Sequence, residues 1–375
     1  MEGEDPALVI VTDKMLRELG VEVLVAAGTP LEEAAWVTEC LVLSNLKGVD
    51  SHGVMQIPGY VKAINEGFLK PGAEPRLISE RAATSFFDGC WGYGYTIARE
   101  VMGRTMAKAK EVGVAYSGVV NVHHIGRVGR WVEMALEEDM IGIASQPGGV
   151  YIAPWGGLDR KLPIAPVGFA VPTKRHPPIV VDMSMGPIAG GRTKILATRG
   201  MRVHEGWYID DDGNPVDDPK FFNSGNGAQL PLGQAGLGYK GMALSLMVDI
   251  LAGPLLGLSA AEVHPFKRRG IFLAAIDVEA FTPIDQFKEA MDSVIDDLKS
   301  ARLANGFDEI MVPGEPEWRE QERRLREGIY LDDPIYRDIL KTAEELGVDT
   351  SKYKGRPGKT EVTHPSYALK HRYGP

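Results

Sequence analysis

The stretch VAYSGVVNVHHIGRVGRWVEMALEEDMIGIAS, residues 114–145, decides the fold class of this chain. Residues 114–120 and 141–145 are apolar runs of strand length, and residues 128–138 have the apolar spacing of a helix. Strand, helix and strand in direct succession are typical of α/β proteins. We therefore expect a mixed α/β fold.

The segments on the N-terminal side of this stretch add mostly helices. Thr29-Pro30-Leu31-Glu32 resembles a capping box with proline at the first helical position. It predicts the start of a helix that runs to about residue 45. Thr96 is expected to cap a helix that Gly113 ends. The other elements expected here are a helix at 12–19, a short helix at 60–66 and a strand at 84–88.

On the C-terminal side, strands and helices alternate. The runs 167–171 and 179–181 predict paired strands, and the strongly apolar run 242–251 predicts a buried helix. Thr282-Pro283 is expected to cap a long helix. The remaining expected elements are a strand at 271–278, that helix as far as residue 305, a helix at 315–327 stopped by Gly328, and a helix at 334–346.

Composition limits both the architecture and the class of function. A chain of 375 residues is too long for one simple core, so two or three lobes are expected. The net charge of −10 argues against nucleic acids and anionic membranes as partners, because both attract basic surfaces. With only Cys40 and Cys90, a disulfide framework and a cysteine-based zinc site are excluded.

The sequence also suggests where the protein resides. The acidic start MEGED does not resemble a secretory signal, which begins basic and then turns apolar. No apolar stretch approaches the ~20 residues that span a bilayer. We expect a soluble cytoplasmic protein without a membrane partner.

Asp50-Ser51-His52-Gly53 follows a well-marked helix and is the first candidate for chemistry. Histidine has an unperturbed pKa of ~6.5 and so exchanges protons near neutrality. The Ser51 hydroxyl can orient one ring nitrogen, and Gly53 allows a ligand close to the backbone. The alternative is a helix end with a solvated or buried structural histidine.

His123 and His124 form a second candidate, since they follow a strand that ends at Val120. Positions just beyond the carboxyl end of a strand are favoured for sites in α/β folds. Adjacent histidines point in different directions and no carboxylate or thiol lies at a helical spacing, so no metal site is expected. Either histidine is an acid–base candidate, and a loop-bracing role is the alternative.

Two further motifs are compatible with ligand binding. Asp182 ends an apolar strand, where a carboxylate can orient a histidine, bind a ribose or simply cap a helix. Residues 236–241 match G-x-G-x-x-G, but a polar segment precedes them instead of the strand that a Rossmann motif requires. What remains is a glycine-rich loop with Lys240 as a candidate anion contact.

Taken together, these segments resemble the type-2 malate/L-lactate dehydrogenase family over residues 12–345. The motifs that carry the resemblance are collinear: GVDSHGVMQIPGY (48–60), NVHHIGRVG (121–129), APWGG (153–157), VDMS (181–184), EGWYIDDDGNPVDDP (205–219), LGYKGMALSLMVDILAGPLLG (237–257) and PGEPE (313–317). The family implies a three-layer α/β fold around a mixed sheet, as in sulfolactate dehydrogenase. This is not a Rossmann fold, and the family is typically homodimeric.

The resemblance implies three discontinuous parts. Residues 1–75 with 310–375 are expected to form a helical, dimerising lobe. Residues 76–120 with 240–309 are expected to form the α/β lobe on the substrate side. Residues 121–239 are expected to bind the nicotinamide cofactor.

The family also implies hydride exchange between a nicotinamide cofactor and the C2 carbon of a small 2-hydroxy or 2-oxo acid. His52, with Ser51 beside it, and His124 match catalytic positions, and the sequence does not say which histidine exchanges the proton. Tyr60 matches a substrate-pocket tyrosine. The positions that match cofactor contacts are Gly148, Asp182, Met183, Ser184, Lys240, Pro313 and Gly314.

The departures from the family pattern concern the substrate carboxylate. Gln56 and Gly59 stand where arginines are usual, and arginine binds a carboxylate with a bidentate fork. Either the substrate lacks that carboxylate, or Arg127 or Arg130 binds it in place of Gln56. A further departure is Pro163-Ile164-Ala165-Pro166 in place of G-T-N-P, and another is Met185 in place of a threonine.

Thr173-Lys174-Arg175-His176 is a basic turn where family members contact the adenosine ribose. Lys174 and Arg175 are therefore candidate cofactor contacts, and a 2′-phosphate there would favour NADP over NAD. A solvated basic turn is the alternative. Two other functions stay open, namely reduction of a cyclic imino acid and an inactive paralogue that serves as a binding or scaffold protein.

Overall fold

A seven-stranded mixed sheet lies at the centre of the computed structural model, which describes residues 8–258 and 270–358. The acidic N-terminal residues and the basic C-terminal tail lie outside these ranges. In spatial order the strands are β2 (Arg76–Glu80), β3 (Thr84–Asp88), β4 (Val114–Val120), β13 (Ile271–Asp277), β5 (Met140–Ser145), β8 (Val167–Val171) and β9 (Ile179–Met183).

The strand–helix–strand stretch forms as predicted, but its two strands are not neighbours. β13, from much later in the chain, lies between β4 and β5 and is antiparallel to both. α5 (Gly129–Leu136) connects β4 to β5 along the chain and packs on β5 and β8. β8 and β9 pair antiparallel, as expected from their sequences.

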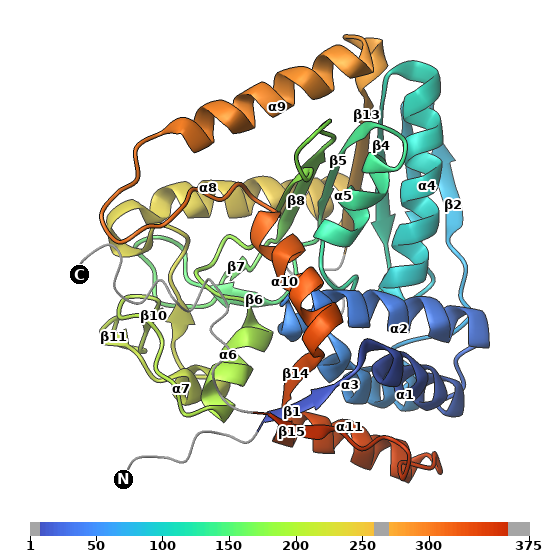
Figure 1. Ribbon diagram of the computed structural model, residues 1–375, viewed down its shortest axis with the longest axis vertical. Coiled ribbons are helices and arrows are strands. Elements are labelled where there is room, and N and C mark those ends of the chain that lie inside the picture. Colours follow the sequence, from blue (N-terminus) through green and yellow to red (C-terminus); the bar gives the residue numbers. More distant parts are fainter. Residues whose placement is uncertain (1–7, 259–269, 359–375) are drawn as a thin grey trace.

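Helices cover both faces of this sheet. On one face α4 (Gly94–Val112) packs on β4 and β13, and the Thr105 hydroxyl donates to Ser117 Oγ at 2.7 Å. The neighbouring Tyr116 points to the opposite face. There its hydroxyl donates to the Leu251 carbonyl of α8 (Gln234–Ala252) at 3.1 Å. Helix, sheet and helix form three layers, as Figure 1 shows.

The two ends of the described chain meet in a helical lobe below the sheet (Figure 1). Its helices are α1 (Asp13–Ala26), α2 (Leu31–Leu46), α3 (Ile57–Asn65), α10 (Glu315–Glu327) and α11 (Asp333–Glu345). A small sheet joins β1 (Leu8–Val11) to β14 (Ile329–Asp332) and β15 (Arg356–Gly358). This agrees with the expected helical lobe from the N- and C-terminal segments.

A third region carries short strands in a second sheet. Their spatial order is β11 (Pro215–Val216), β10 (Tyr208–Ile209), β12 (Ala228–Gln229), β6 (Val150–Ile152) and β7 (Leu162–Pro163). The helices in this region are α6 (Gly190–Thr198) and α7 (Pro219–Asn223). α9 (Ile284–Ser300) follows β13 and the short helix η4 (Val278–Ala280), and lies along the upper edge in Figure 1.

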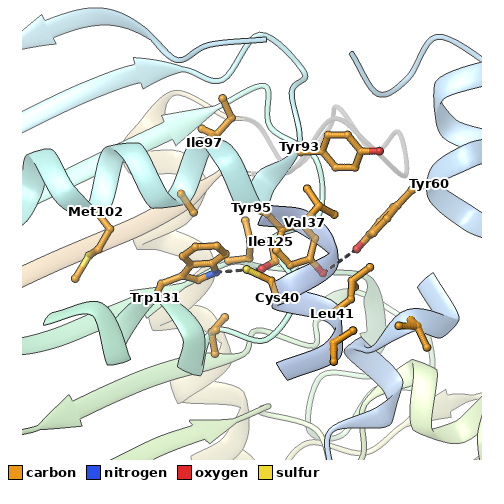
Figure 2. Close-up of a cluster of buried hydrophobic side chains, with 14 of the residues drawn as sticks. Val37, Cys40, Leu41, Tyr60, Tyr93, Tyr95, Ile97, Met102, Ile125 and Trp131 are labelled. Atoms are coloured by element: carbon orange, nitrogen blue, oxygen red, sulfur yellow. Dashed lines mark hydrogen bonds between the residues drawn. The ribbon is translucent and has the colours of Figure 1, made fainter. Parts of the chain in front are cut away.

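The largest core cluster joins the helical lobe to the sheet. Figure 2 shows part of it, with Trp131 of α5, Cys40 of α2 and Tyr95 of α4 packed together. The Trp131 indole donates to the Ile125 carbonyl at 3.1 Å, so its one polar group is satisfied. Burial of these side chains stabilises the junction between the two lobes.

Three predicted caps are wrong because their hydroxyls have other partners. The Thr29 hydroxyl lies 3.1 Å from that of Tyr93, and Pro30 precedes α2 without a side-chain cap. Thr96 lies inside α4 and donates to Glu33. Thr282 contacts Gln286 instead of capping α9, which ends at Ser300 rather than near residue 305. Gly113 and Gly328 do end α4 and α10, as predicted.

The prediction that the apolar helix at 242–251 is buried is also wrong. Its small residues pack inward, whereas large ones face outward: Leu244 is 40% exposed, Met247 48% and Ile250 53%. By length and composition alone, the segment Gln234–Leu256 would suffice to cross a membrane, contrary to our expectation for this chain. That criterion is also met by core helices of soluble proteins, so it carries little weight.

The G-x-G-x-x-G segment is not a loop, because residues 236–241 lie within α8. Gly241 is required for packing: an added Cβ would lie 2.4 Å from the Leu232 carbonyl. The Lys240 ammonium extends over the Tyr239 ring at 6.0 Å. The segment therefore lets α8 approach the preceding chain, and a phosphate loop is not formed.

Candidate active site

The Asp50–His52 segment forms a short 3-10 helix, η1, directly after α2. Arg324 of α10 binds the Asp50 carboxylate with both terminal nitrogens, at 2.6 and 3.1 Å, and Asn45 donates to it at 2.7 Å. Burial would raise the pKa of Asp50, but the charge and hydrogen bonds of Arg324, together with the Asn45 hydrogen bond, outweigh it and lower that pKa. A buried ion pair thus fixes the segment that carries His52.

Gly53 serves a different purpose from the one expected. The Asn45 amide fills the space beside it, and an added Cβ would lie 2.1 Å from Asn45 Oδ1. That oxygen accepts from the Val54 amide at 2.8 Å. Gly53 is therefore required by the Asn45 side chain, not by an approaching ligand.

His52 is half-buried and oriented by its neighbour. The Ser51 hydroxyl lies 3.0 Å from His52 Nδ1, as the tetrapeptide predicted. Burial, and then the charge of Arg127, lower the pKa of His52 to about 4. The imidazole is therefore neutral at physiological pH, with Nε2 turned away from Ser51.

His124 lies in the loop after β4, and a chain of hydroxyl groups leads to it. The Tyr60 hydroxyl is 2.8 Å from His124 Nδ1 and 3.0 Å from the Tyr95 hydroxyl, the latter contact drawn in Figure 2. Burial raises the pKa of Tyr95 well above its usual value, so Tyr95 stays a neutral phenol. Gly94 allows α4 to begin against the His123 and His124 carbonyls, where a Cβ would clash at 2.4 Å.

The two candidate histidines meet. The rings of His52 and His124 stack with centroids 5.5 Å apart and planes 25° apart. Two protonated imidazoles at this distance would repel each other, which disfavours a positive charge on both rings at once. The structure therefore brings together the two histidines that the sequence placed 72 positions apart.

A cavity of about 400 Å³ opens beside His124, and we call it the histidine cavity. That volume suits a small organic acid. Gln56 lines it, but its amide donates to the Ser51 carbonyl at 2.7 Å and so also braces the segment that carries His52. The lining residues are Gln56, Gly59, Tyr60, Lys62, Ala63, Glu66, His123 and His124.

A second cavity, of about 310 Å³, lies between α10 and β9, and we call it the Asp182 cavity. Arg127 is buried there, 2.6 Å from Glu133 and 3.6 Å from Asp182. Lys47 also pairs with Glu133 at 2.6 Å. Burial raises the pKa of Asp182, opposed by Arg127 and by the Gly129 amide that donates to it at 2.9 Å.

The predicted contacts at 313–314 belong to this same cavity. The Pro313 carbonyl accepts from the Val180 amide at 3.0 Å, which holds Gly314 against β9. Trp318 lines the cavity and is 45% exposed, so its ring is available for stacking. The lining thus holds four carboxylates, three cations and the Trp318 ring: Glu133, Glu137, Asp182, Glu317, Lys47, Arg127 and Arg130. A carboxylate can bind the ribose hydroxyls of a dinucleotide, a cation its phosphates and an exposed ring its base.

The other predicted cofactor residues line neither cavity. Ser184 donates to the Gly186 carbonyl, Met183 is 38% exposed, and Lys240 lies on the outer part of α8. Gly148 adopts φ +70° beside Ile164. Lys174 and Arg175 form ion pairs with α9. Their cofactor roles stay predictions.

Arg130, the alternative carboxylate ligand, lines the Asp182 cavity and lies over the Trp36 ring at 5.0 Å. Arg127, predicted to bind substrate, instead has two protein carboxylates as partners. It does not line the histidine cavity, and its charge helps to lower the pKa of His52.

Sequence reasoning missed the residues that hold this site. These residues lie on helices whose sequences are typical of ordinary core or surface helices, namely Arg324, Asn45, Tyr95 and Glu133. The sequence pointed to only one of them: Asn45 is a polar residue at the end of the apolar face of a predicted helix. Within residues 8–258 and 270–358, no three His, Cys, Asp or Glu side chains are grouped to hold a metal.

The chain is similar in sequence to known dehydrogenases. A family model described as malate/L-lactate dehydrogenase matches residues 11–340. The chain is 36% identical to malate dehydrogenase of Pyrococcus horikoshii over 335 residues, which cover 87% of this chain and 91% of that protein.

Two solved structures share the fold. Sulfolactate dehydrogenase from Methanocaldococcus jannaschii matches with a TM-score of 0.81 and 29% identity, covering 91% of this chain and 98% of that one. Δ1-piperideine-2-carboxylate reductase from Pseudomonas syringae matches with a TM-score of 0.77 and 26% identity, covering 89% and 99%. The predicted sulfolactate-dehydrogenase-like fold is confirmed.

Proposed function

Because the chain belongs to the malate/L-lactate dehydrogenase family, a family of oxidoreductases, we propose that it interconverts a small 2-hydroxy acid and its 2-oxo acid with a nicotinamide cofactor. The observation that carries this proposal is the stacked pair of His52 and His124 at a cavity of small-molecule size. Arg127 links this pair to the Asp182 cavity, whose residues fit a dinucleotide, because it lines that cavity and its charge lowers the pKa of His52.

The histidines supply the proton chemistry. In the oxidation direction the substrate hydroxyl gives its proton to a neutral imidazole, and its C2–H bond gives a hydride to the cofactor when bound. His52 is neutral at working pH and can accept that proton. In the reverse direction the same imidazolium returns the proton to the developing alkoxide, which stabilises its negative charge.

Tyr60 and Ser51 orient the two rings. If the Tyr60 hydroxyl donates to His124 Nδ1, the proton of the His124 ring lies on Nε2, from which it can be donated to the substrate oxygen. If His52 Nδ1–H donates to Ser51, its Nε2 is left as an acceptor. With these tautomers one ring accepts the proton while the other binds the oxygen, which assigns His52 as base and His124 as anchor.

A second candidate reaction is reduction of a cyclic imino acid. Gln56 and Gly59 leave the histidine cavity without arginine among its lining residues, which weakens recognition of a plain 2-oxo acid. The structural similarity to a piperideine-carboxylate reductase supports the same idea. Both reactions use the same histidines, and they differ in whether carbon is bound to oxygen or nitrogen.

The test is a substrate panel under steady-state conditions. Pyruvate, oxaloacetate, a sulfonated 2-oxo acid and cyclic imino acids would each be offered with NADH and with NADPH. Turnover of a 2-oxo acid supports the leading proposal, and turnover of the imines alone supports the second. Failure to bind either dinucleotide in calorimetry would contradict both and favour a scaffold role.

We also propose a homodimer, with α8 in the interface. Leu244, Met247 and Ile250 form an exposed apolar face on α8. Large exposed apolar patches on soluble proteins mark sites of association with another protein. Ile250→Glu should shift the sedimenting species from dimer to monomer, whereas an unchanged dimer would place the interface elsewhere. Cytoplasmic location stays a prediction.

A further inference from the structure

The basic turn at 173–176 joins β8 to β9 at the mouth of the Asp182 cavity. The two residues that follow it, Pro177 and Pro178, line that cavity. A dinucleotide in this cavity that extends along these prolines would reach the turn. The charge of the turn therefore bears on which dinucleotide is accepted.

A carboxylate of α9 already occupies the centre of the turn. Asp292 accepts from the backbone amides of Lys174, Arg175 and His176, at 3.2, 2.9 and 3.4 Å. Its residue is only 2% exposed, and the Arg175 guanidinium lies 3.2 Å from the same carboxylate. Successive backbone amides of this kind form an anion site, and here the protein fills it itself.

The side chains of the turn are paired in the same way. Asp296 lies 2.6 Å from Arg175 and 2.8 Å from His176. Lys174 lies 2.7 Å from Glu289 and 3.6 Å from Asp285. Four carboxylates thus face two permanent cations and one histidine, so the local charge is negative. In Figure 1, α9 lies close to the tip of this hairpin.

We propose that Asp292 and Asp296 make the protein select NAD over NADP. This inference rests on the proposed nicotinamide chemistry. NADP differs from NAD by a 2′-phosphate, which needs free cations and amide donors. Here those donors are bound to α9, and the phosphate would meet carboxylates of like charge. The basic turn, which from the sequence alone favoured NADP, therefore acts in the opposite sense.

The test compares dinucleotide binding rather than turnover. NADH and NADPH are titrated separately by nicotinamide fluorescence or calorimetry, without substrate. The wild-type protein should bind NADH at least about tenfold more tightly than NADPH. Asp296→Asn should tighten NADPH binding by about three- to fivefold, the effect of one exposed charge, and leave NADH unchanged.

Asp297→Asn is the matched control. Asp297 is the next residue on α9, is exposed, and is not joined to the turn by any ion pair or hydrogen bond in the described structure. It changes the net charge equally and should alter neither affinity. Glu289→Gln/Asp296→Asn should enlarge the gain for NADPH, and thermal melting verifies that each variant folds.

Each outcome has a distinct meaning. Equal binding of NADH and NADPH by the wild type, or tighter NADPH, would overturn the inference and leave the proposed function intact. An identical response of Asp296→Asn and Asp297→Asn would overturn it too. Binding of neither dinucleotide would instead contradict the proposed function.

Discussion

The histidine cavity and the Asp182 cavity use charge in opposite ways. At the first, the His52 ring that stacks on His124 is kept neutral, and the hydroxyl groups of Ser51 and Tyr60 contact the two imidazoles. In the second, Arg127 is buried between the carboxylates of Glu133 and Asp182, and Lys47 pairs with Glu133. The groups for which we propose proton exchange thus contact hydroxyl groups, whereas those for which we propose dinucleotide binding form ion pairs.

The largest expected effect concerns the ionic cavity. Arg127→Met would leave Glu133 and Asp182 without their shared cation, and breaking a buried pair costs about 3 kcal/mol or more. Urea unfolding at neutral pH measures the loss. Arg202→Met removes an exposed pair with Asp217 and should cost less than about 1 kcal/mol. Equal losses for the two variants would show that the network does not stabilise the fold.

The next effect tests the neutral cavity. His52→Ala should lower turnover by ~10²-fold and leave dinucleotide affinity nearly unchanged, because it removes the proton acceptor only. Steady-state kinetics and a binding titration separate the two quantities. His204→Ala changes an exposed histidine that lines neither cavity and should have no effect. Full turnover of His52→Ala would move the base assignment to His124.

Stability should depend on pH through His52. Its folded-state pKa is depressed to about 4, whereas the unfolded chain binds that proton below about 6.5. Between these values the unfolded state binds more protons, so stability falls as pH falls. We expect a loss of about 2 kcal/mol from pH 7 to pH 5, absent in His52→Gln. Parallel curves for the two proteins would contradict the depressed pKa.

The smallest effect tests the hydroxyl chain. Tyr60→Phe removes the hydrogen bond to His124 Nδ1. We expect kcat to fall by about tenfold, with little change in dinucleotide affinity. Tyr330→Phe removes a surface hydroxyl next to Glu327 and serves as control. If Tyr60→Phe raised KM alone, Tyr60 would contact substrate without orienting His124.

Local patterns predicted much of the fold. The strand at β4, the helices at 31–45 and 315–327, and the stops at Gly113 and Gly328 follow from periodicity and capping within short windows. The position of β13 between β4 and β5 could not follow, because it pairs residues far apart in sequence. The exposure of α8 was missed for a related reason, since apolar content does not reveal what covers a helix.

The candidate site likewise combines residues that sequence motifs predicted with surroundings that they did not. His52, Ser51, His124 and Tyr60 came from motifs, and the structure joins them through direct contacts. The carboxylate partners of the basic turn could not be predicted, because they lie on α9, more than a hundred residues away in sequence. Sequence motifs therefore identify the residues of a site more readily than their electrostatic surroundings.

The central claim is that His52 and His124 act as one proton-handling unit. Single-turnover rates of His52→Ala, His124→Ala and the double variant test it most directly, with each protein saturated with dinucleotide. Residues that act as a unit are not additive, so the double variant should be about as slow as the slower single variant. Multiplication of the two single losses, or a full rate in either single variant, would contradict the claim.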